Sequence, residues 1–192
     1  MISTSTTAAP AAPTDFRQLL ESCRSQPLLV DGLRPELCPD LAEIILGRMQ
    51  GDRGRKVGSL NVGGWKSGED FFAWSDAPVQ ELRKALVEAI WGRSMVGWAM
   101  VNRAGSQHPR HQHRAASLTG IYYVTVGNAA AKTPTVFECP CDARMLRGTP
   151  RYELEVEPHP GRLVVFRGET WHRVPSCSGE EPRITVAFDV RR

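Results

Sequence analysis

Two hydrophobic periods divide the chain. Up to about residue 92, apolar residues recur every three to four positions, the period of a helix that buries one face. This pattern predicts helices at Asp15–Cys23, Pro39–Gln50 and Pro78–Trp91, with Thr14 and Asp40 as the caps of the first two. From Ser94 onward the pattern changes to alternation and to short β-branched and aromatic runs, which predict strands.

Six segments of the second half are expected to be strands, because Gly, Pro and Asn separate them. They are Ser94–Asn102, Leu118–Val126, Thr133–Phe137, Arg151–Val156, Arg162–Phe166 and Arg183–Val190. A shorter extended piece is expected at Val57–Val62 in a loop-rich stretch. Helices followed by a run of strands favour an α+β chain whose C-terminal half is a sheet sandwich or barrel. With no internal repeat and no interior linker, residues 15–192 are expected to form a single domain.

Composition narrows the class of protein. Residues 1–14 are Ser, Thr, Ala and Pro with little to bury, so we expect a disordered tail that lacks the apolar run of a secretory signal. No apolar run approaches the ~20 residues that span a bilayer. The net charge of +3 is small and the basic residues are scattered, which disfavours nucleic acid. Five irregularly spaced cysteines read as reduced thiols, with packing the favoured role of Cys139 and Cys141. We therefore expect a cytoplasmic protein with neither a membrane nor a nucleic-acid partner.

Four of the five histidines lie in two places, His108-Pro-Arg-His111-Gln-His113 and Trp171-His172. In a strand, side chains two apart share a face, so His111 and His113 are expected to project together. A third imidazole from a distant strand would complete a three-nitrogen metal site with positions left free. His108 is a possible substitute ligand for His113. The alternative interpretation is a polar loop with exposed histidines, and His159, in a Pro-flanked turn, is expected to be exposed.

An arginine opens the last predicted strand, eleven residues beyond His172. Arg183 must either reach solvent or pair with an anion. A planar guanidinium at the mouth of a metal cavity is suited to hold a carboxylate by a two-point contact.

Further motifs stand in order around these residues. They are Asn61-Val62-Gly63-Gly64-Trp65-Lys66-Ser67; Asn102 and Gly105 before His111 and His113; Thr119, Gly120, Tyr122 and Tyr123 after them; Gly161 to Phe166; and Arg183-Ile184-Thr185-Val186-Ala187-Phe188. In this order and spacing the chain resembles the Fe(II)- and 2-oxoglutarate-dependent oxygenases, and among them a bacterial and phage branch with a His-x-His motif. The resemblance covers roughly residues 55–190.

The resemblance implies a double-stranded β-helix, a jelly-roll or cupin-like core with the N-terminal helices packed outside. It implies a dioxygenase that uses Fe(II), 2-oxoglutarate and O2 to hydroxylate a C–H bond of a small molecule, with release of succinate and CO2. His111, His113 and His172 would hold the iron, and Arg183, with Thr185 on its face, would bind the far carboxylate of 2-oxoglutarate.

The remaining expected contacts divide into two groups. Cosubstrate hydrogen bonds are expected from Asn102 and from Tyr122 or Tyr123, of which at most one points inward because neighbours in a strand alternate. The substrate pocket is expected to be shaped by Trp65, Trp74 and Trp171.

One departure from the family pattern keeps other functions open. Most of these oxygenases carry Asp or Glu where this chain has His113. A three-His, cupin-type metal dioxygenase without 2-oxoglutarate is one alternative, in which Arg183 would bind the substrate's carboxylate. A zinc hydrolase is another, although Glu169 is the only carboxylate near His172. A cupin-like binding module without catalysis is the third.

Overall fold

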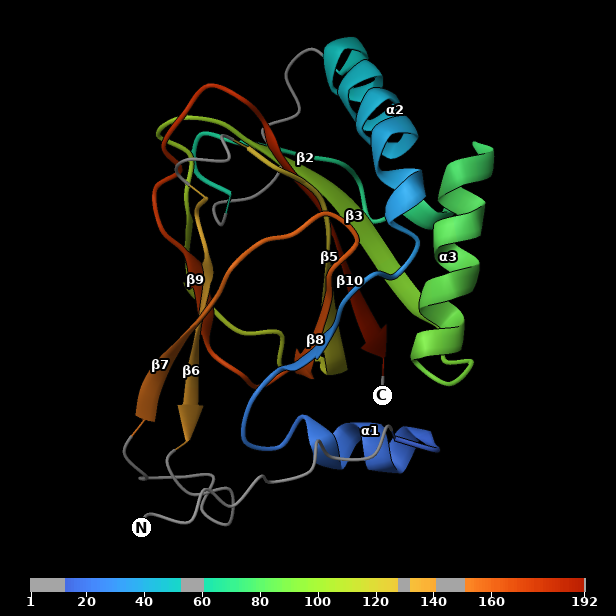
Figure 1. The fold of residues 1–192 in the computed structure, drawn as a ribbon, viewed down its shortest axis with the longest axis vertical. Coiled ribbons are helices and arrows are strands. Elements are labelled where there is room, and N and C mark those ends of the chain that lie inside the picture. Colours follow the sequence, from blue (N-terminus) through green and yellow to red (C-terminus); the bar gives the residue numbers. More distant parts are fainter. Residues whose placement is uncertain (1–12, 53–60, 128–131, 141–150, 192) are drawn as a thin grey trace, which may run out of the picture.

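Two antiparallel sheets face each other in the computed structural model, which describes residues 13–52, 61–127, 132–140 and 151–191 (Figure 1). The larger sheet has the strand order β1 (Leu28–Val30), β8 (Leu163–Arg167), β5 (Ala116–Val126), β10 (Arg183–Arg191), β3 (Met95–Asn102) and β2 (Trp65–Lys66). The smaller sheet has the order β4 (His108–His111), β9 (His172–Val174), β6 (Thr135–Pro140) and β7 (Arg151–Val156). From β3 onward the chain crosses repeatedly between the two sheets, and this confirms the expected double-stranded β-helix.

Some expectations fall on parts of the chain that the structure does not describe. Residues 1–12 of the expected tail and most of the extended piece at 57–62 lie outside the described residues. Cys141 also lies outside them, whereas Cys139 is fully buried in the core between the two sheets.

The three helices of the described residues begin in different ways, and of these only α1 has a side-chain cap. In α1 (Phe16–Ser22) the cap is Asp15 and not Thr14, because the Asp15 carboxylate accepts a 2.8 Å bond from the Gln18 amide. Helix α2 (Cys38–Gly51) begins before Asp40, since a 3-10 turn, η1 (Pro35–Leu37), runs directly into it. Helix α3 (Ala77–Ala89) follows Asp76, after a second 3-10 turn, η2 (Phe71–Ala73).

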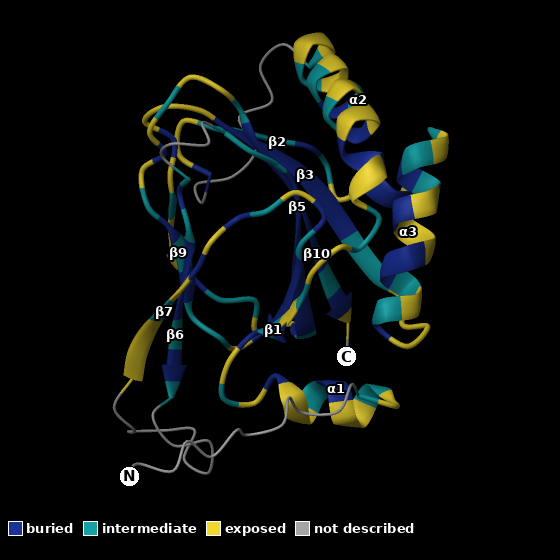
Figure 2. Cartoon of the chain, viewed as in Figure 1, coloured by how far each residue is buried: buried dark blue, intermediate teal, exposed yellow. Residues whose placement is uncertain are grey.

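Helices α2 and α3 cover the outer face of the larger sheet (Figures 1 and 2). Their buried residues, among them Leu41, Ile45, Leu82 and Leu86, join one apolar core with side chains from that face of β3, β5, β8 and β10. Burying a leucine or isoleucine of this size contributes about 1.5–3 kcal/mol. This layer leaves the opposite face of the larger sheet free to meet the smaller sheet.

Alternation along the strands decides which side chains enter the space between the sheets. On β10, Ile184, Val186 and Phe188 point toward the helices, so Arg183 and Thr185 point between the sheets. Close packing enforces this register, because a Cβ on Gly120 would lie 2.1 Å from the Phe188 ring. A larger residue at position 120 would therefore displace Phe188 and shift the strand that carries Arg183.

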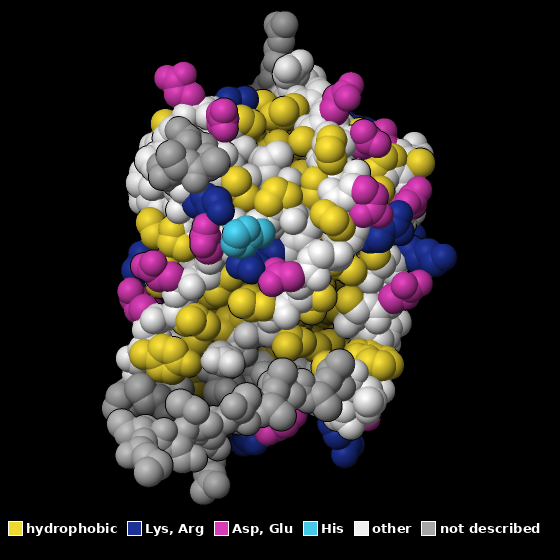
Figure 3. Space-filling model, in the orientation of Figure 1, with side chains coloured by type: hydrophobic (Ala, Val, Ile, Leu, Met, Phe, Trp, Pro, Cys, Tyr) yellow, Lys and Arg dark blue, Asp and Glu magenta, His cyan; other side chains and the backbone are white. Residues whose placement is uncertain are grey.

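The outer surface carries charges of both signs, interspersed over the face shown in Figure 3. Among the described residues, no helix has the length and apolarity required to cross a membrane. The side chain of His159 is 43% exposed, as the Pro-flanked turn predicted.

Candidate metal centre

Strand pairing in the smaller sheet places His111 and His172 side by side. The two residues stand directly opposite each other on β4 and β9, and their ring centroids are 4.2 Å apart. Directly opposed side chains on antiparallel strands have Cβ atoms about 4.5–5.5 Å apart. The sheet therefore brings a residue from near the C-terminus next to the first histidine cluster. Both side chains are buried between the sheets.

His113 reaches the same place by a different route from the expected one. Strand β4 ends at His111, so His113 lies in the following turn and does not share a strand face with His111. The turn is held by Gly168, whose carbonyl accepts a 2.6 Å bond from the His113 amide. A Cβ on Gly168 would lie 2.5 Å from the His113 carbonyl oxygen, so only glycine fits there without a backbone shift.

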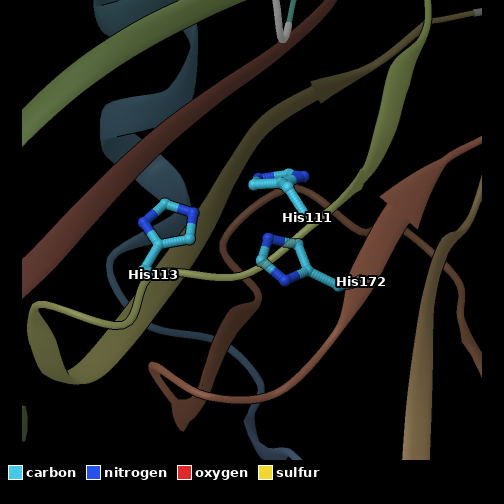
Figure 4. Close-up of side chains that lie close together, drawn as sticks. All are labelled: His111, His113 and His172. Atoms are coloured by element: carbon cyan, nitrogen blue, oxygen red, sulfur yellow. The ribbon is translucent and has the colours of Figure 1, made fainter.

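The three imidazoles converge (Figure 4), and one ligand nitrogen from each lies within 4.8 Å of the other two. Each Nδ1 is already hydrogen bonded: that of His111 to the Pro109 carbonyl at 2.8 Å, that of His172 to the Thr170 carbonyl at 3.0 Å, and that of His113 to Asp189 at 3.0 Å.

A carbonyl oxygen can only accept, and a carboxylate accepts as well when ionised. In each neutral ring the proton is therefore on Nδ1, and Nε2 keeps the lone pair that binds a metal. Three imidazole nitrogens suit Fe(II) or Zn(II). The donor set fits a metal ion.

Burial favours the neutral form of two of the three imidazoles. It lowers the pKa of His111 and lowers that of His172 well below its usual range, because a charged imidazole would lose its hydration between the sheets. Neutral rings at neutral pH are the form that a metal requires.

His108 lies at the edge of this group. Its ring packs edge-on against that of His111, with centroids 4.5 Å apart, and burial lowers its pKa to about 3. It lines the same cavity, yet it is not one of the three residues whose ligand atoms converge.

An unpaired cation lies deeper in the cavity. Arg183 is 3% exposed, and within the described ranges it forms no ion pair. Its guanidinium donates to the Thr133 carbonyl at 3.3 Å and to Thr135 Oγ1 at 3.0 Å. A buried charge without a counter-ion is costly, so this arrangement favours the binding of an anion.

Thr185 supports the same interpretation. It is fully buried, lines the cavity with Arg183, and its Oγ1 has no hydrogen-bond partner in the described part of the chain. Unpaired buried hydroxyls are rare in folded proteins. A carboxylate that met both groups would satisfy the guanidinium and the hydroxyl together.

The two tyrosines face opposite sides of β5, as alternation requires. Tyr123 points between the sheets, where its hydroxyl meets Thr135 Oγ1 at 2.7 Å and its ring lies 5.2 Å from the Arg183 guanidinium carbon. Tyr122 points toward the helices and donates to the Leu33 and Arg34 carbonyls at 3.0 Å.

Neither tyrosine lines the cavity, and neither does Asn102, whose amide donates to Asn61 Oδ1 at 2.9 Å. Tyr123 instead packs beside Arg183 and bonds to Thr135, which Arg183 also contacts. Asn102 bonds to Asn61 and so anchors the loop that carries it.

The three tryptophans expected at the pocket lie elsewhere. Trp65 packs with the helix-side core and donates to Asp52 at 3.3 Å, and Trp74 is buried in that core. The ring of Trp171, half-buried, lies 3.8 Å from the guanidinium carbon of Arg110. None of the three lines the cavity that holds the histidines.

Trp98 occupies the place expected for those tryptophans. It lines the cavity, and its ring stacks on that of His113 with an interplanar angle of 5° and centroids 5.8 Å apart. Alternation on the predicted strand already put Trp98 on the face of Met100 and Asn102. Because Asn102 was expected to face the cosubstrate, this alternation is the signal that could have identified Trp98.

Residues 96–189 match the model of a family described as "Putative 2OG-Fe(II) oxygenase". No curated protein matches the chain significantly.

Solved structures with the same fold cover most of the chain. A prolyl-4-hydroxylase from Pseudomonas putida is 18% identical, with a TM-score of 0.64 over 90% of this chain and 98% of that one. A prolyl hydroxylase from Trichoplax adhaerens, solved with a peptide fragment of the hypoxia-inducible factor oxygen degradation domain, is 10% identical, with a TM-score of 0.68 over 92% and 90%. The epimerase SnoN, solved with Fe3+, α-ketoglutarate and nogalamycin RO, is 14% identical, with a TM-score of 0.62 over 90% and 83%. At these identities the likeness establishes the fold.

Proposed function

We propose that this protein, which belongs to the 2OG-Fe(II) oxygenase superfamily, hydroxylates a C–H bond of a small molecule, with its iron on His111, His113 and His172. As an enzyme of this class it uses Fe(II), 2-oxoglutarate and O2. The observation that carries the site assignment is the pairing, in one cavity, of three converging imidazoles with a buried arginine that has no counter-ion among the described residues.

Each group in the cavity has a defined part in this proposal. The Nε2 atoms of the three histidines would hold Fe(II), and Arg183 with Thr185 would bind the distal carboxylate of 2-oxoglutarate. When bound, Fe(II) and 2-oxoglutarate would supply the oxidation. In it, 2-oxoglutarate and O2 become succinate and CO2, and one oxygen atom enters the substrate's C–H bond.

The protein's own residues would orient the bound anion and exclude water from the cavity. Arg183 is held by Thr133 and Thr135, so its guanidinium is oriented before an anion arrives. The buried walls around it would keep bulk water from the bound Fe(II) and 2-oxoglutarate.

A small, largely apolar substrate is part of the proposal. The side chains that complete the cavity wall are mainly apolar, among them Trp98, Met100, Val174 and Ala187. Such a wall suits the hydrocarbon part of a small molecule. The alternative is a peptide, the kind of ligand bound to the Trichoplax enzyme. Stimulation of 2-oxoglutarate consumption by one class and not the other separates the two.

A cytoplasmic location and the absence of a nucleic-acid partner also remain proposals. The four described cysteines are free and buried, which suits a reducing compartment. The net charge of +3 is too small to favour nucleic acid.

The test is an anaerobic titration of Fe(II) into metal-free protein with 2-oxoglutarate, followed through the weak visible charge-transfer band of the chelate. The parent should form the band, and His172→Ala and Arg183→Ala should lose it. Arg173→Ala is the matched control, because Arg173 follows His172 on β9 but points outward to an ion pair with Glu153 at 3.0 Å. It should keep the band.

The other results select the rival chemistries. Iron binding without a band would favour the three-His dioxygenase that needs no 2-oxoglutarate. Binding of zinc but not iron would favour a hydrolytic site. Either result would contradict the proposed function.

A further inference from the structure

One of the three imidazoles differs from the others in the group behind it. The Nδ1 atoms of His111 and His172 meet neutral carbonyl oxygens. The Nδ1 of His113 meets a carboxylate, 3.0 Å from Asp189 Oδ2 and 2.9 Å from Oδ1. A full negative charge is therefore linked directly to this imidazole only.

The carboxylate is held in place by its neighbour across the sheet. Asp189 on β10 stands opposite Thr119 on β5, and Thr119 Oγ1 donates to Asp189 Oδ1 at 2.9 Å. The Asp189 side chain is only 22% exposed, so its orientation is set by these two bonds and not by solvent.

No other cation pairs with Asp189 in the described parts of the chain. Among the residues that the structure describes, its ion-pair partner is His113. Asp189 also influences Lys66 through space, but the Lys66 ammonium lies 4.3 Å from the centroid of the Trp98 ring and forms no ion pair among the described residues. The negative charge of Asp189 is thus directed at His113.

We propose that Asp189 is a positioning residue that gives His113 partial anionic character and so supplies negative charge to a metal site built from three neutral imidazoles. This inference rests on the proposed metal centre. A carboxylate that accepts a hydrogen bond from the Nδ1–H of a ligating histidine fixes the orientation of that ring and raises the basicity of its Nε2. Within the described ranges, Asp189 is the anionic group that contacts a proposed metal ligand.

Asp189→Asn separates charge from shape, because an amide oxygen can still accept the Nδ1–H bond. We expect the dissociation constant for Fe(II) alone, measured anaerobically by competition with a chromophoric chelator, to rise about 10–100-fold. The charge-transfer band should also shift in energy. Thermal unfolding of the metal-free variant checks that it is folded.

Glu138→Gln is the matched control. Glu138 lies on β6 beside β9, and its carboxylate pairs with Arg110 and touches no histidine of the cavity. This variant removes the same charge from the same sheet sandwich and should leave the affinity for Fe(II) within about twofold. An equal loss in both variants would mean that Asp189 acts only through the general field, which would overturn the proposal.

Repeating Asp189→Asn in a His113 variant tests whether Asp189 acts on the metal site through His113. His113→Asp removes the imidazole through which Asp189 is proposed to act. In that background Asp189→Asn should weaken the binding of Fe(II) much less than it does in the parent. Weakening by the same factor in both backgrounds would refute transmission through His113.

Failure of this inference can be told from failure of the proposed function. If the parent binds Fe(II) and forms the band, but Asp189→Asn binds as tightly as the parent, only the role of Asp189 is wrong. If the parent binds no Fe(II), the metal centre itself is wrong and this inference falls with it.

Discussion

Replacing Thr185 by valine should make the ligand-free protein more stable and the cosubstrate site weaker. The hydroxyl of Thr185 is fully buried and has no hydrogen-bond partner among the described residues. Valine keeps nearly the same volume and replaces the hydroxyl with a methyl group. The same atom that lacks a partner in the free protein would meet the carboxylate of 2-oxoglutarate beside Arg183, so the two effects should have opposite signs.

The expected changes in stability and in affinity for 2-oxoglutarate follow from the loss of the Thr185 hydroxyl. Burying one without a hydrogen bond costs about 1–3 kcal/mol in proteins, so Thr185→Val should raise the free energy of unfolding by about 1–2 kcal/mol. In a chain of this length each kcal/mol raises the midpoint of thermal unfolding by about 2–4 °C. A hydrogen bond to a charged group contributes about 1.5–3 kcal/mol, so 2-oxoglutarate should bind ~10–100-fold more weakly.

Thr135→Val is the matched control. Thr135 is also fully buried and lines the same cavity, but its Oγ1 is bonded to the Tyr123 hydroxyl at 2.7 Å and to Arg183 at 3.0 Å. The same substitution there should lower the free energy of unfolding by about 1–3 kcal/mol, because it leaves buried partners unsatisfied.

Urea denaturation of the metal-free proteins measures stability, and titration of the charge-transfer band in the iron-loaded proteins measures affinity for 2-oxoglutarate. A Thr185→Val protein no more stable than the parent would refute the reasoning about the free protein, since the hydroxyl must then be satisfied in solution. A gain in stability with unchanged affinity would refute its contact with the cosubstrate.

Three further predictions concern the histidines and the turn that carries His113. His172→Ala should abolish tight Fe(II) binding in a chelator competition assay, whereas His108→Ala should retain it within about tenfold, because His108 is outside the converging triad. Gly168→Ala should weaken Fe(II) binding in the same assay without unfolding the protein, since its Cβ would press on the His113 carbonyl at 2.5 Å. Burial lowers the folded pKa of His108, His111 and His172, so the unfolded chain takes up protons first as the pH falls. The metal-free protein should therefore lose up to about 1.4 kcal/mol of stability per pH unit per histidine below pH ~6.5 in urea titrations, and a flat profile would contradict this.

Local hydrophobic periodicity was sufficient to predict most of the longer helices and strands. The predicted strand at Arg183–Val190 is observed as β10 at Arg183–Arg191, and the predicted helix at Pro78–Trp91 is observed as α3 at Ala77–Ala89. The helix caps were less predictable, because neighbouring polar residues compete for the same amides. Asp15 caps α1 where Thr14 was expected, since it is the Asp15 carboxylate that reaches the Gln18 amide.

For the site, spacing predicted which residues belong to it, and the fold determined how they meet. Thr185 shares the face of Arg183 because both are on one strand, and this needed no tertiary information. His113 does not share a strand with His111, so the reason expected for their meeting is wrong, although their ring centroids lie 5.1 Å apart. Their approach depends on the turn that Gly168 holds.

The sequence pattern predicted the three helices and the strands β3, β5, β6, β7, β8 and β10, but not β1, β2, β4 or β9. It also predicted the alternation that puts Arg183 and Thr185 on one face, and the residue types suited to a metal and an anion. These properties depend on near neighbours in the chain and on side-chain chemistry. Two contacts follow from the tertiary structure. Trp98, and not Trp65, Trp74 or Trp171, borders the histidines, and Asp189 bonds to His113. Such contacts join residues far apart in sequence, and they depend on which sheet faces meet, which no local period encodes.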